Sequence, residues 1–392
     1  MTSAASFEPW PSFTREEADI VQRVLLSNKV NYWTGDEGRQ FEAEFAAWCG
    51  VDHAVAVANG TVALDLAWRA LDIGPGDEVV VTPRTFIASA SSIVNAGATP
   101  VFADVDPDSQ NITATTIAAV LTPQTRAILC VHLAGWPCDM ASIIALAQDR
   151  GLAVVEDCAQ AHGATYKGCP VGGLGDIGAW SFCQDKIMTT GGEGGMVTTN
   201  DPALARRMWS YKDHGKDWDA VHRDDHPPGY RWLHHGFGTN WRMTEMQAAL
   251  GLHQLGQLPD WHKKRADNAA RIAQAIENMP VFRMPMPPAD MGHAWYKAHF
   301  FVQPDNLKQG WDRDRIMAEI NDRGVPCQTG ICPEVYLESA FDGHVARPAH
   351  RLPVAQQLGE TSLMLPVHPT LSAGNMDKMC EALILVGEMA SQ

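Results

Sequence analysis

Short apolar segments alternate with helical stretches from residue 54 to residue 200, and no other feature of the sequence restricts the fold as strongly. The helical stretches are about 10–15 residues long. Strands this apolar, separated by helices, predict an α/β fold in which a mostly parallel sheet is covered by helices on both faces. Ligands of such sheets bind at the carboxyl ends of the strands. The predicted strands cover residues 54–58, 78–82, 99–105, 126–133, 152–157, 178–182 and 194–200.

The alternation stops after the last of these segments. Residues 200–243 are rich in aromatic residues and histidine and lack clear periodicity, which predicts a long surface excursion. The run TEMQ at 244–247 matches a capping box and predicts a helix that ends near Leu258. We therefore expect a large domain over residues 1–258 and a smaller C-terminal α+β domain over residues 259–392. In the smaller domain we expect a strand near 295–303, a helix over 312–323, a strand near 361–366 and a helix over 374–389.

The chain of 392 residues is acidic, with 30 Lys and Arg against 46 Asp and Glu and a formal net charge of -16. This excess opposes binding to nucleic acid or to anionic membranes, although a local positive pocket could still hold a small anion. No apolar run approaches the roughly 18 residues that span a bilayer. The first residues, MTSAASFEPWPSFTREEADI, lack the basic start and apolar stretch of a signal peptide. We expect neither nucleic-acid nor membrane partners.

Cysteine and histidine are numerous but are not spaced as metal ligands. The nine cysteines are odd in number and contain no C-x-x-C pair. We therefore expect reduced thiols in a cytoplasmic protein, rather than a disulfide framework or a zinc site. A run of histidines lacks the H-E-x-x-H spacing of a metal site, so we predict no bound metal. The run comprises His214, His222, His226, His234 and His235.

Residues suited to catalysis are concentrated in 154–201. Asp157 ends a predicted buried strand, where a lone carboxylate is usually a helix cap or a turn former. An enzyme that uses pyridoxal phosphate (PLP) needs a carboxylate in this setting, since it keeps the pyridinium nitrogen protonated. Lys186 follows a buried strand and precedes GGEGG. It could project into a strand-end crevice and form an imine with an aldehyde, although most lysines are simply solvated.

Three further features suit a phosphate and an aromatic ring at the same strand ends. Gly60 and Thr61 open the helix after the first strand and offer backbone N–H groups and a hydroxyl, although a tight turn is the alternative for this glycine. Ser181, on the strand before Lys186, adds a second hydroxyl. Phe86 could stack on a ring, although an aromatic residue here is more often part of the core. With the carboxylate and the lysine, these residues predict one crevice.

In these segments the chain resembles the PLP-dependent sugar aminotransferases of the DegT/DnrJ/EryC1/StrS family, which share fold type I with aspartate aminotransferase. The similarity runs from Phe41 to Leu371, so it covers nearly the whole chain. Each matching segment is weakly specific alone, whereas the joint pattern is highly specific. The segments are GTVAL (60–64), TF (85–86) with GATPVFADVD (97–106), VHLAGWPCDM (131–140), EDCAQAHG (156–163), SFCQDK (181–186) with GGEGGMV (191–197), NWRMTEMQAA (240–249), LPVA (352–355) and LPVHP (365–369).

The resemblance implies a role for each matching residue. It implies that Lys186 forms an imine with PLP and shuttles protons, and that Asp157 pairs with the pyridinium nitrogen. Asn240 resembles the residue that reaches the cofactor phosphate of the neighbouring subunit, which implies a homodimer with shared active sites. The other implied cofactor contacts are Gln160 beside the ring, Phe86 stacked on it, and Gly60, Thr61 and Ser181 around the phosphate.

Three features bear on how closely the chain follows this family. Relatives that act as sugar 3-dehydratases carry His in place of the lysine, so Lys186 favours transamination. Asn59 stands where Ser is commoner in the family, and CQD at 183–185 is an unusual sequence before the lysine. Both departures leave the fine contacts of the site open.

The C-terminal segments GVPCQTGICPEVYLESAF (324–341) and LGETSLMLPVHPTL (358–371) resemble members that aminate nucleotide-linked 4-keto-6-deoxy sugars for surface polysaccharide. The resemblance implies L-glutamate as the amino donor. Five residues are candidate contacts for the sugar or the donor, although each is equally well a surface or loop residue. They are His293, Tyr296, Glu334, Tyr336 and Arg242.

Other functions must be weighed against transamination. A nicotinamide dehydrogenase would need G-x-G-x-x-G after the first strand, and the sequence NGT at 59–61 does not supply it. A PLP-dependent dehydratase, aldolase or lyase stays open; only a transaminase would accumulate pyridoxamine phosphate and release a keto acid. A PLP-binding regulator without turnover usually carries an added DNA-binding domain, which the short acidic segment before the family match does not provide.

Overall fold

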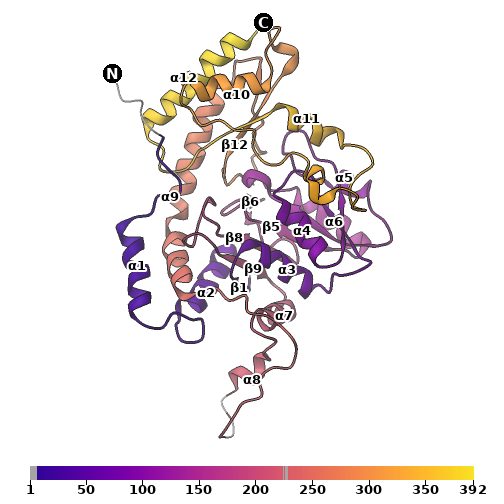
Figure 1. Ribbon diagram of the computed structural model, residues 1–392, viewed down its shortest axis with the longest axis vertical. Coiled ribbons are helices and arrows are strands. Elements are labelled where there is room, and N and C mark those ends of the chain that lie inside the picture. The colour runs from indigo at the N-terminus through magenta and orange to yellow at the C-terminus, as the bar shows by residue number, and fades with distance from the viewer. Residues whose placement is uncertain (1–6, 224, 226–227) are drawn as a thin grey trace.

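A seven-stranded sheet forms the centre of the larger part of the molecule (Figure 1). The computed structural model describes residues 7–223, 225 and 228–392, and all contacts given below lie within them. The strands are β1 (His53–Val57), β2 (Glu78–Val81), β3 (Thr99–Phe102), β4 (Thr125–Val131), β5 (Ala153–Asp157), β8 (Ile177–Ser181) and β9 (Gly195–Thr199). Their order is β1-β9-β8-β5-β4-β2-β3. Only β9 runs antiparallel to its neighbours, so the predicted mostly parallel sheet is confirmed.

Helices cover both faces of this sheet. The helices of this part are α1 (Arg15–Leu26), α2 (Glu37–Cys49), α3 (Gly60–Ala70), α4 (Ile87–Asn95), α5 (Ala114–Ala118), α6 (Met140–Arg150), α7 (Pro202–Lys212), α8 (Trp218–His222) and α9 (Glu245–Ile276). Neighbouring residues of a strand point to opposite faces. Val79 and Val81 of β2 therefore pack with α3 and α4, while Val80 packs with α5 and α6. Both sides of each central strand are buried, which explains its continuous apolar sequence.

Residues 200–243 contain more regular structure than the sequence predicts. Asp201 caps α7, because its Oδ1 accepts the N–H groups of Ala203 and Leu204 at 2.7 and 3.3 Å. The chain then forms α8 and returns toward the sheet. We call residues 214–239 the arm. In Figure 1, α8 lies at the far end of the molecule from α12 (Ala373–Ala390), and it projects away from the sheet.

The smaller part has its own core around a sheet with the order β10-β12-β13. The strands of this sheet are β10 (Phe282–Arg283), β12 (Ala298–Val302) and β13 (Ser362–Leu365), and helices α10 (Arg313–Asp322) and α11 (Pro353–Thr361) lie in the same stretch of the chain. The predicted strands and the helix over 312–323 contain the observed ones, whereas α11 was not expected. Short elements elsewhere are β6 (Thr165–Tyr166), β7 (Cys169–Pro170), β11 (Met291–Gly292), η1 (Leu133–Gly135), η2 (Pro304–Asn306), η3 (Val335–Leu337) and η4 (Ser339–Phe341).

One helix, α9, joins the two parts and belongs to both cores. It has 32 residues and contains Pro259, so the expectation that it ends near Leu258 is wrong. A proline inside a helix removes a backbone hydrogen bond. Burial on both sides outweighs that loss, since Leu255 packs on the large part and Ile272 in the small one. We propose that the chain divides into domains over residues 1–258 and 259–392, so that the domain boundary falls inside this shared helix. Over the described residues, no helix is both long and apolar enough to cross a membrane.

Candidate active site

A cavity of about 610 Å³ lies at the carboxyl ends of the central strands. Its walls come from the loops after β1, β2, β5 and β8, so segments far apart in the sequence meet there. Among the predicted cofactor contacts, Asn240 is the exception and does not line it. The cavity brings together Gly60, Thr61, Phe86, Asp157, Gln160, Ser181 and Lys186.

Helix α3 begins at the cavity and turns its N-terminus toward it. Asn59 caps this helix, because its Oδ1 accepts the N–H of Val62 at 3.0 Å. The residue that departs from the family pattern is therefore still a capping side chain. A Cβ atom on Gly60 would lie 2.5 Å from Cβ of Ser181, so only glycine lets the helix start this close to β8. Free backbone N–H groups, beside the hydroxyls of Thr61 and Ser181, suit an anion such as phosphate.

Asp157, at the end of β5, is 6% exposed. Its carboxylate oxygens have separate donors. Ser89 Oγ donates to Oδ2 at 2.8 Å, and the backbone N–H of Ala159 donates to Oδ1 at 3.1 Å. Burial raises the pKa of Asp157, while the two hydrogen bonds and the charge of Lys186 act in the opposite direction. The site thus holds a carboxylate in a defined orientation against the cavity.

Gln160 and Phe86 complete the walls in different ways. Oε1 of Gln160 accepts the N–H of Ala134 at 2.7 Å, which fixes its amide at the cavity wall. Phe86 directly precedes α4 and is 63% exposed, although it lines the cavity. An exposed aromatic ring at a cavity edge is available to stack on a planar ligand.

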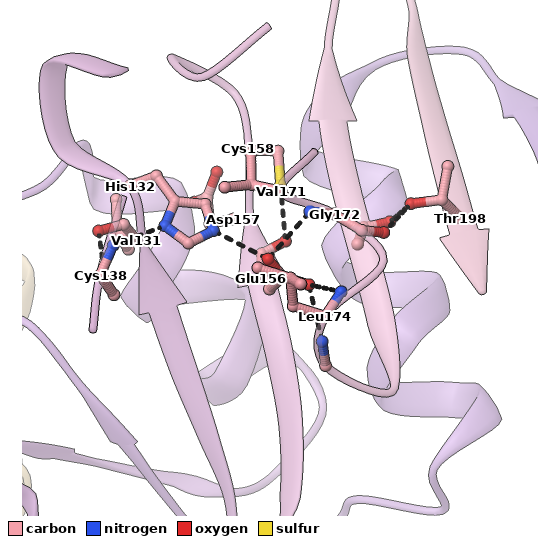
Figure 2. A network of polar contacts seen from close by, with 12 residues as sticks. Val131, His132, Cys138, Glu156, Asp157, Cys158, Val171, Gly172, Leu174 and Thr198 are labelled. Carbon is pink, nitrogen blue, oxygen red and sulfur yellow. Dashed lines mark hydrogen bonds and ion pairs between the residues drawn. The ribbon is translucent and has the colours of Figure 1, made fainter. Parts of the chain in front are cut away.

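Beneath Asp157, a buried network fixes the end of β5 (Figure 2). Glu156 accepts a hydrogen bond from Nε2 of His132 at 3.0 Å. Nδ1 of His132 accepts the backbone N–H of Cys138 at 3.0 Å, so the ring proton lies on Nε2. Burial alone would raise the pKa of Glu156, but its hydrogen bonds outweigh burial and lower it. Its other donors are the backbone N–H groups of Gly172, Leu174 and Gly175, each at 2.8 Å.

This network also contains the one group of side chains in the described ranges whose atoms lie as close together as metal ligands. The atoms of His132, Glu156 and Cys158 all lie within 4.8 Å of one another. Both ring nitrogens of the histidine and both carboxylate oxygens already have hydrogen-bond partners. The group is therefore a support for β5 rather than a free ligand set. His226, of the predicted histidine run, lies outside the described residues.

Lys186 follows β8, and its side chain is 16% exposed. Nζ lies 3.7 Å from Oδ1 of Asp185, its sequence neighbour. The carbonyl oxygen of Lys186 accepts a hydrogen bond from Nε1 of Trp10 at 2.8 Å. The N–H of Gln184 donates to the carbonyl of Gly192 at 3.0 Å, so the glycine-rich segment folds back along the lysine loop. The φ of 130° at Gly192 is one that L side chains rarely adopt.

Two predicted substrate contacts come from the segment before β12, and only one approaches the cavity. The hydroxyl of Tyr296 donates to Oδ2 of Asp185, a residue of the cavity wall. Burial and the charge of Asp185 raise the pKa of Tyr296. His293 lies apart from the cavity, and its Nδ1 accepts the N–H of Trp295 at 2.8 Å. Its ring stacks on Trp295 with a centroid distance of 3.9 Å, and burial lowers the pKa of His293 to about 3.

Glu334 and Tyr336 are not brought to the cavity. Nε of Arg351 lies 3.0 and 3.1 Å from the two carboxylate oxygens of Glu334. The hydroxyl of Tyr336 donates to the same carboxylate and accepts the N–H of Leu352 at 2.9 Å. The ring of Tyr336 packs on Phe102 in the core. Their polar atoms thus already serve the loop between η3 and α11.

Asn240 and Arg242 lie where the arm returns to the sheet. Nη1 of Arg242 donates to Oδ1 of Asp213 at 2.7 Å. Oδ1 of Asn240 accepts the N–H of Arg242 at 3.4 Å, and the residue is exposed. Neither side chain lines the cavity of its own chain.

Two contacts of the site escape sequence reasoning. Ser89 donates to Asp157, and its position four residues after Thr85, another hydroxyl residue, is the only signal in the sequence. Trp10 has no signal, because its partner Lys186 lies 176 positions away in the chain.

The sequence model of the DegT/DnrJ/EryC1/StrS aminotransferase family matches residues 11–384. The spore coat polysaccharide biosynthesis protein SpsC of Bacillus subtilis is 37% identical over 374 residues, 95% of each chain. The dTDP-3-amino-3,4,6-trideoxy-alpha-D-glucose transaminase of Streptomyces venezuelae is 36% identical over 370 residues, 94% of this chain and 92% of the relative. Among solved structures, an aminotransferase from Psychrobacter cryohalolentis is 62% identical, with a TM-score of 0.97 over 98% of this chain and 99% of that one.

These similarities confirm fold type I and PLP as the cofactor. The cavity fits that group in three respects: a lysine amine, a buried carboxylate, and a helix N-terminus that leaves no room for a Cβ atom at Gly60. The geometry and the similarities agree. The chain belongs to the DegT/DnrJ/EryC1/StrS aminotransferase family of PLP-dependent enzymes.

Proposed function

We propose that this aminotransferase moves an amino group from an amino acid, L-glutamate, to a keto sugar carried on a nucleotide, such as a 4-keto-6-deoxy sugar. The observation that carries the proposal is the cavity, which gathers Lys186, Asp157 and the N-terminus of α3. The names of the relatives support the substrate class, since one is a transaminase of a dTDP-linked amino sugar and another serves polysaccharide biosynthesis. The product would be an amino sugar for a surface polysaccharide.

When bound, PLP supplies an aldehyde that captures amines and a ring that withdraws electrons from the carbon that loses a proton. Nζ of Lys186 would hold this group through its amine. When free, the same amine would take a proton from the donor carbon as a general base and give it back as a general acid. Low exposure of the lysine side chain keeps water away from that transfer.

The remaining cavity residues bind and orient the group. A carboxylate oxygen of Asp157 keeps a proton on the ring nitrogen. The N-terminus of α3 and the hydroxyls of Thr61 and Ser181 bind the phosphate. Phe86 and Gln160 lie beside the ring. These roles are proposals supported by the lining of the cavity.

We further propose a homodimer in which Asn240 contacts the phosphate bound by the partner subunit. Two observations support this. Asn240 is exposed and lies outside the cavity of its own chain, and the arm that precedes it carries exposed aromatic side chains. Large exposed apolar side chains gathered in one segment are typical of a surface that another protein covers. We also propose a cytoplasmic location, because the cysteines are free thiols.

The proposal is tested by incubating the enzyme with L-glutamate and a panel of dTDP-, UDP- and GDP-linked keto sugars. We expect an aminated sugar, identified by mass and NMR, in equal amount to the 2-oxoglutarate released. Elimination of water from the sugar, without 2-oxoglutarate, would instead assign the chain to the dehydratases and lyases. PLP binding without turnover of any sugar would favour a regulator.

A further inference from the structure

A chain of buried hydroxyl groups ends on Asp157, and the mechanism above does not use it. Oγ1 of Thr85 lies 2.7 Å from Oγ of Ser89, which lies 2.8 Å from Oδ2 of Asp157. All three side chains are buried. Thr85 stands just before α4 and Ser89 in its first turn, so the start of this helix sets their spacing.

The direction of each hydrogen bond follows from the group at the end of the chain. An ionised carboxylate only accepts, so Ser89 donates to Asp157. Ser89 has one hydroxyl proton, and that proton is then used. Thr85 must therefore be the donor in its contact with Ser89. Since Thr85 lines the cavity, the chain of donors runs in one direction, from the cavity wall to the carboxylate.

The carboxylate needs such donors because of where it lies. Burial raises the pKa of Asp157, and a more basic carboxylate competes with a pyridine nitrogen for one proton. Hydrogen bonds to the charged form oppose this effect. Within the described part of the chain, only Ser89 and the N–H of Ala159 donate to its carboxylate oxygens.

Other charged or titratable groups face Asp157 from the neighbouring elements. Lys186 approaches from the loop after β8, and its charge favours the ionised carboxylate. His132 stands at the end of β4, but its ring proton points to Glu156, the preceding residue of β5. The side chains of Lys186, His132 and Glu156 do not donate a hydrogen bond to Asp157. The side-chain hydrogen bond that favours the ionised carboxylate therefore comes from the hydroxyl of Ser89.

We propose that Ser89 is a positioning residue: by donating to Asp157, it lets the proton shared with the ring nitrogen of PLP rest on the nitrogen. Thr85 acts one step further out by orienting the hydroxyl of Ser89. The inference rests on the proposed role of Asp157 as the partner of that nitrogen. No residue is consumed and no further reactant is required, since one proton moves between two atoms.

The test compares two pairs of variants. Ser89→Ala removes the donor, and Ser92→Ala is its matched control. Ser92 is buried on the same helix, but its Oγ accepts Nε1 of Trp68 at 3.0 Å and donates to the carbonyl of Ser89 at 3.3 Å. Thr85→Val removes the outer hydroxyl while preserving shape, and Thr85→Ser retains it. Each protein is loaded with PLP that carries ¹⁵N in the ring.

Three quantities are measured: the ring ¹⁵N chemical shift, the dissociation constant of PLP, and the unfolding temperature. For Ser89→Ala we expect the resonance to move toward that of unprotonated pyridine and PLP to bind about tenfold more weakly, as befits a lost hydrogen bond to a charged group. Thr85→Val should give a smaller shift of the same sign. Ser92→Ala should lower the unfolding temperature but leave the ¹⁵N resonance unchanged. Thr85→Ser should also leave the resonance unchanged.

Asp157→Asn, measured alongside, separates the two levels of the proposal. If it moves the resonance while Ser89→Ala and Thr85→Val behave as Ser92→Ala does, the role of Ser89 is overturned and that of Asp157 stands. If Asp157→Asn also leaves the resonance in place, the role of Asp157 itself fails. Should Ser89→Ala not fold, the Thr85→Val and Thr85→Ser pair decides, because an equal resonance in both overturns the chain of donors.

Discussion

The cavity wall carries most of the residues expected to bind the cofactor, and the arm leads directly to another, Asn240, yet the wall and the arm are built in opposite ways. In the wall, Asp157 and the supporting Glu156 are buried and have hydrogen-bond partners within the chain. On the arm, Tyr230, Trp232 and Phe237 are 76%, 84% and 101% exposed. Buried polar groups need hydrogen-bond partners within the fold. Exposed aromatic rings remain accessible to another protein surface. The wall is therefore buried and paired within one chain, whereas these three rings of the arm are left to solvent.

The difference predicts which changes act within one subunit and which act between two. The largest effect should follow Lys186→Ala. We expect a loss of transfer of roughly 10⁴-fold or more, because both the covalent hold on PLP and the proton transfer disappear. PLP should still bind weakly through the N-terminus of α3. Borohydride reduction of the wild-type enzyme, followed by peptide mapping, should place PLP on Lys186; label on Lys167, Lys212 or Lys216 would contradict the assignment.

Asp157→Asn should come next. The change keeps the shape of the side chain but removes the charge that holds a proton on the ring nitrogen. We expect retained PLP and a fall in turnover on the order of 10³-fold, as for other preorganised charges. Steady-state kinetics with Asp149→Asn, an exposed carboxylate on α6, provides the control. Turnover within a few fold of wild type would leave Asp157 only a structural role.

Glu156→Gln tests whether the wall depends on its supporting network. An amide oxygen cannot replace both carboxylate oxygens, so we expect a loss of at least about 2 kcal/mol in the free energy of unfolding. The folded-state pKa of Glu156 is lowered, so its contribution is complete above the usual value of 4.5 and falls as pH drops through the folded-state pKa. Urea unfolding from pH 7 to pH 3 should show a flatter acid limb in the variant. Unchanged stability at pH 7 would speak against a supporting role.

Subunit mixing tests the shared active site proposed for Asn240, the residue that follows the arm. Lys186→Ala and Asn240→Ala are each expected to be inactive as homodimers. In a mixed dimer, one active site carries both changes and the other carries neither, so up to half of the wild-type activity per mixed dimer should return. Exchange is followed with two differently tagged chains. Recovery that fails despite proven exchange, or full activity of a monomer, would remove the shared site.

The smallest effect on the subunit itself should come from Trp232→Ala. Because the ring is exposed, we expect the free energy of unfolding of the dissociated subunit to change by no more than about 0.5 kcal/mol. Trp68→Ala, on α3 in the core of the larger part, should cost about 3–5 kcal/mol. Sedimentation should show weaker dimerisation for Trp232→Ala but not for Trp68→Ala. A cost above 2 kcal/mol in the dissociated subunit would mean that the arm packs on its own chain.

The wall was largely predictable because strand ends of a parallel sheet converge. Gly60, Asp157 and Lys186 all lie at or just after the ends of predicted strands, and that rule alone places them in one crevice. The rule says nothing of residues that reach the site from elsewhere. Trp10 arrives from the N-terminal segment, and Ser89 depends on how α4 begins.

The loops of the smaller part were less predictable, since polar residues in a loop carry no mark of their partner. Glu334 and Tyr336 resemble free ligand contacts in the sequence, but Arg351 and Leu352 occupy their polar atoms. The length of α9 was also hidden. A proline is a sound reason to end a helix, and only burial against two cores carries the backbone past it.

The pairing of β1 with β9 has a consequence for synthesis on the ribosome. His53 pairs with Thr199 and Val57 with Gly195, so among the described residues the first strand of the sheet pairs with no strand but β9, the last of this sheet in the chain. A nascent chain that has just exposed β1 must carry it unpaired while the intervening segments are translated. Gly60 cannot meet Ser181 before then either. The PLP cavity therefore cannot form on the ribosome until β8 and Lys186 have been translated.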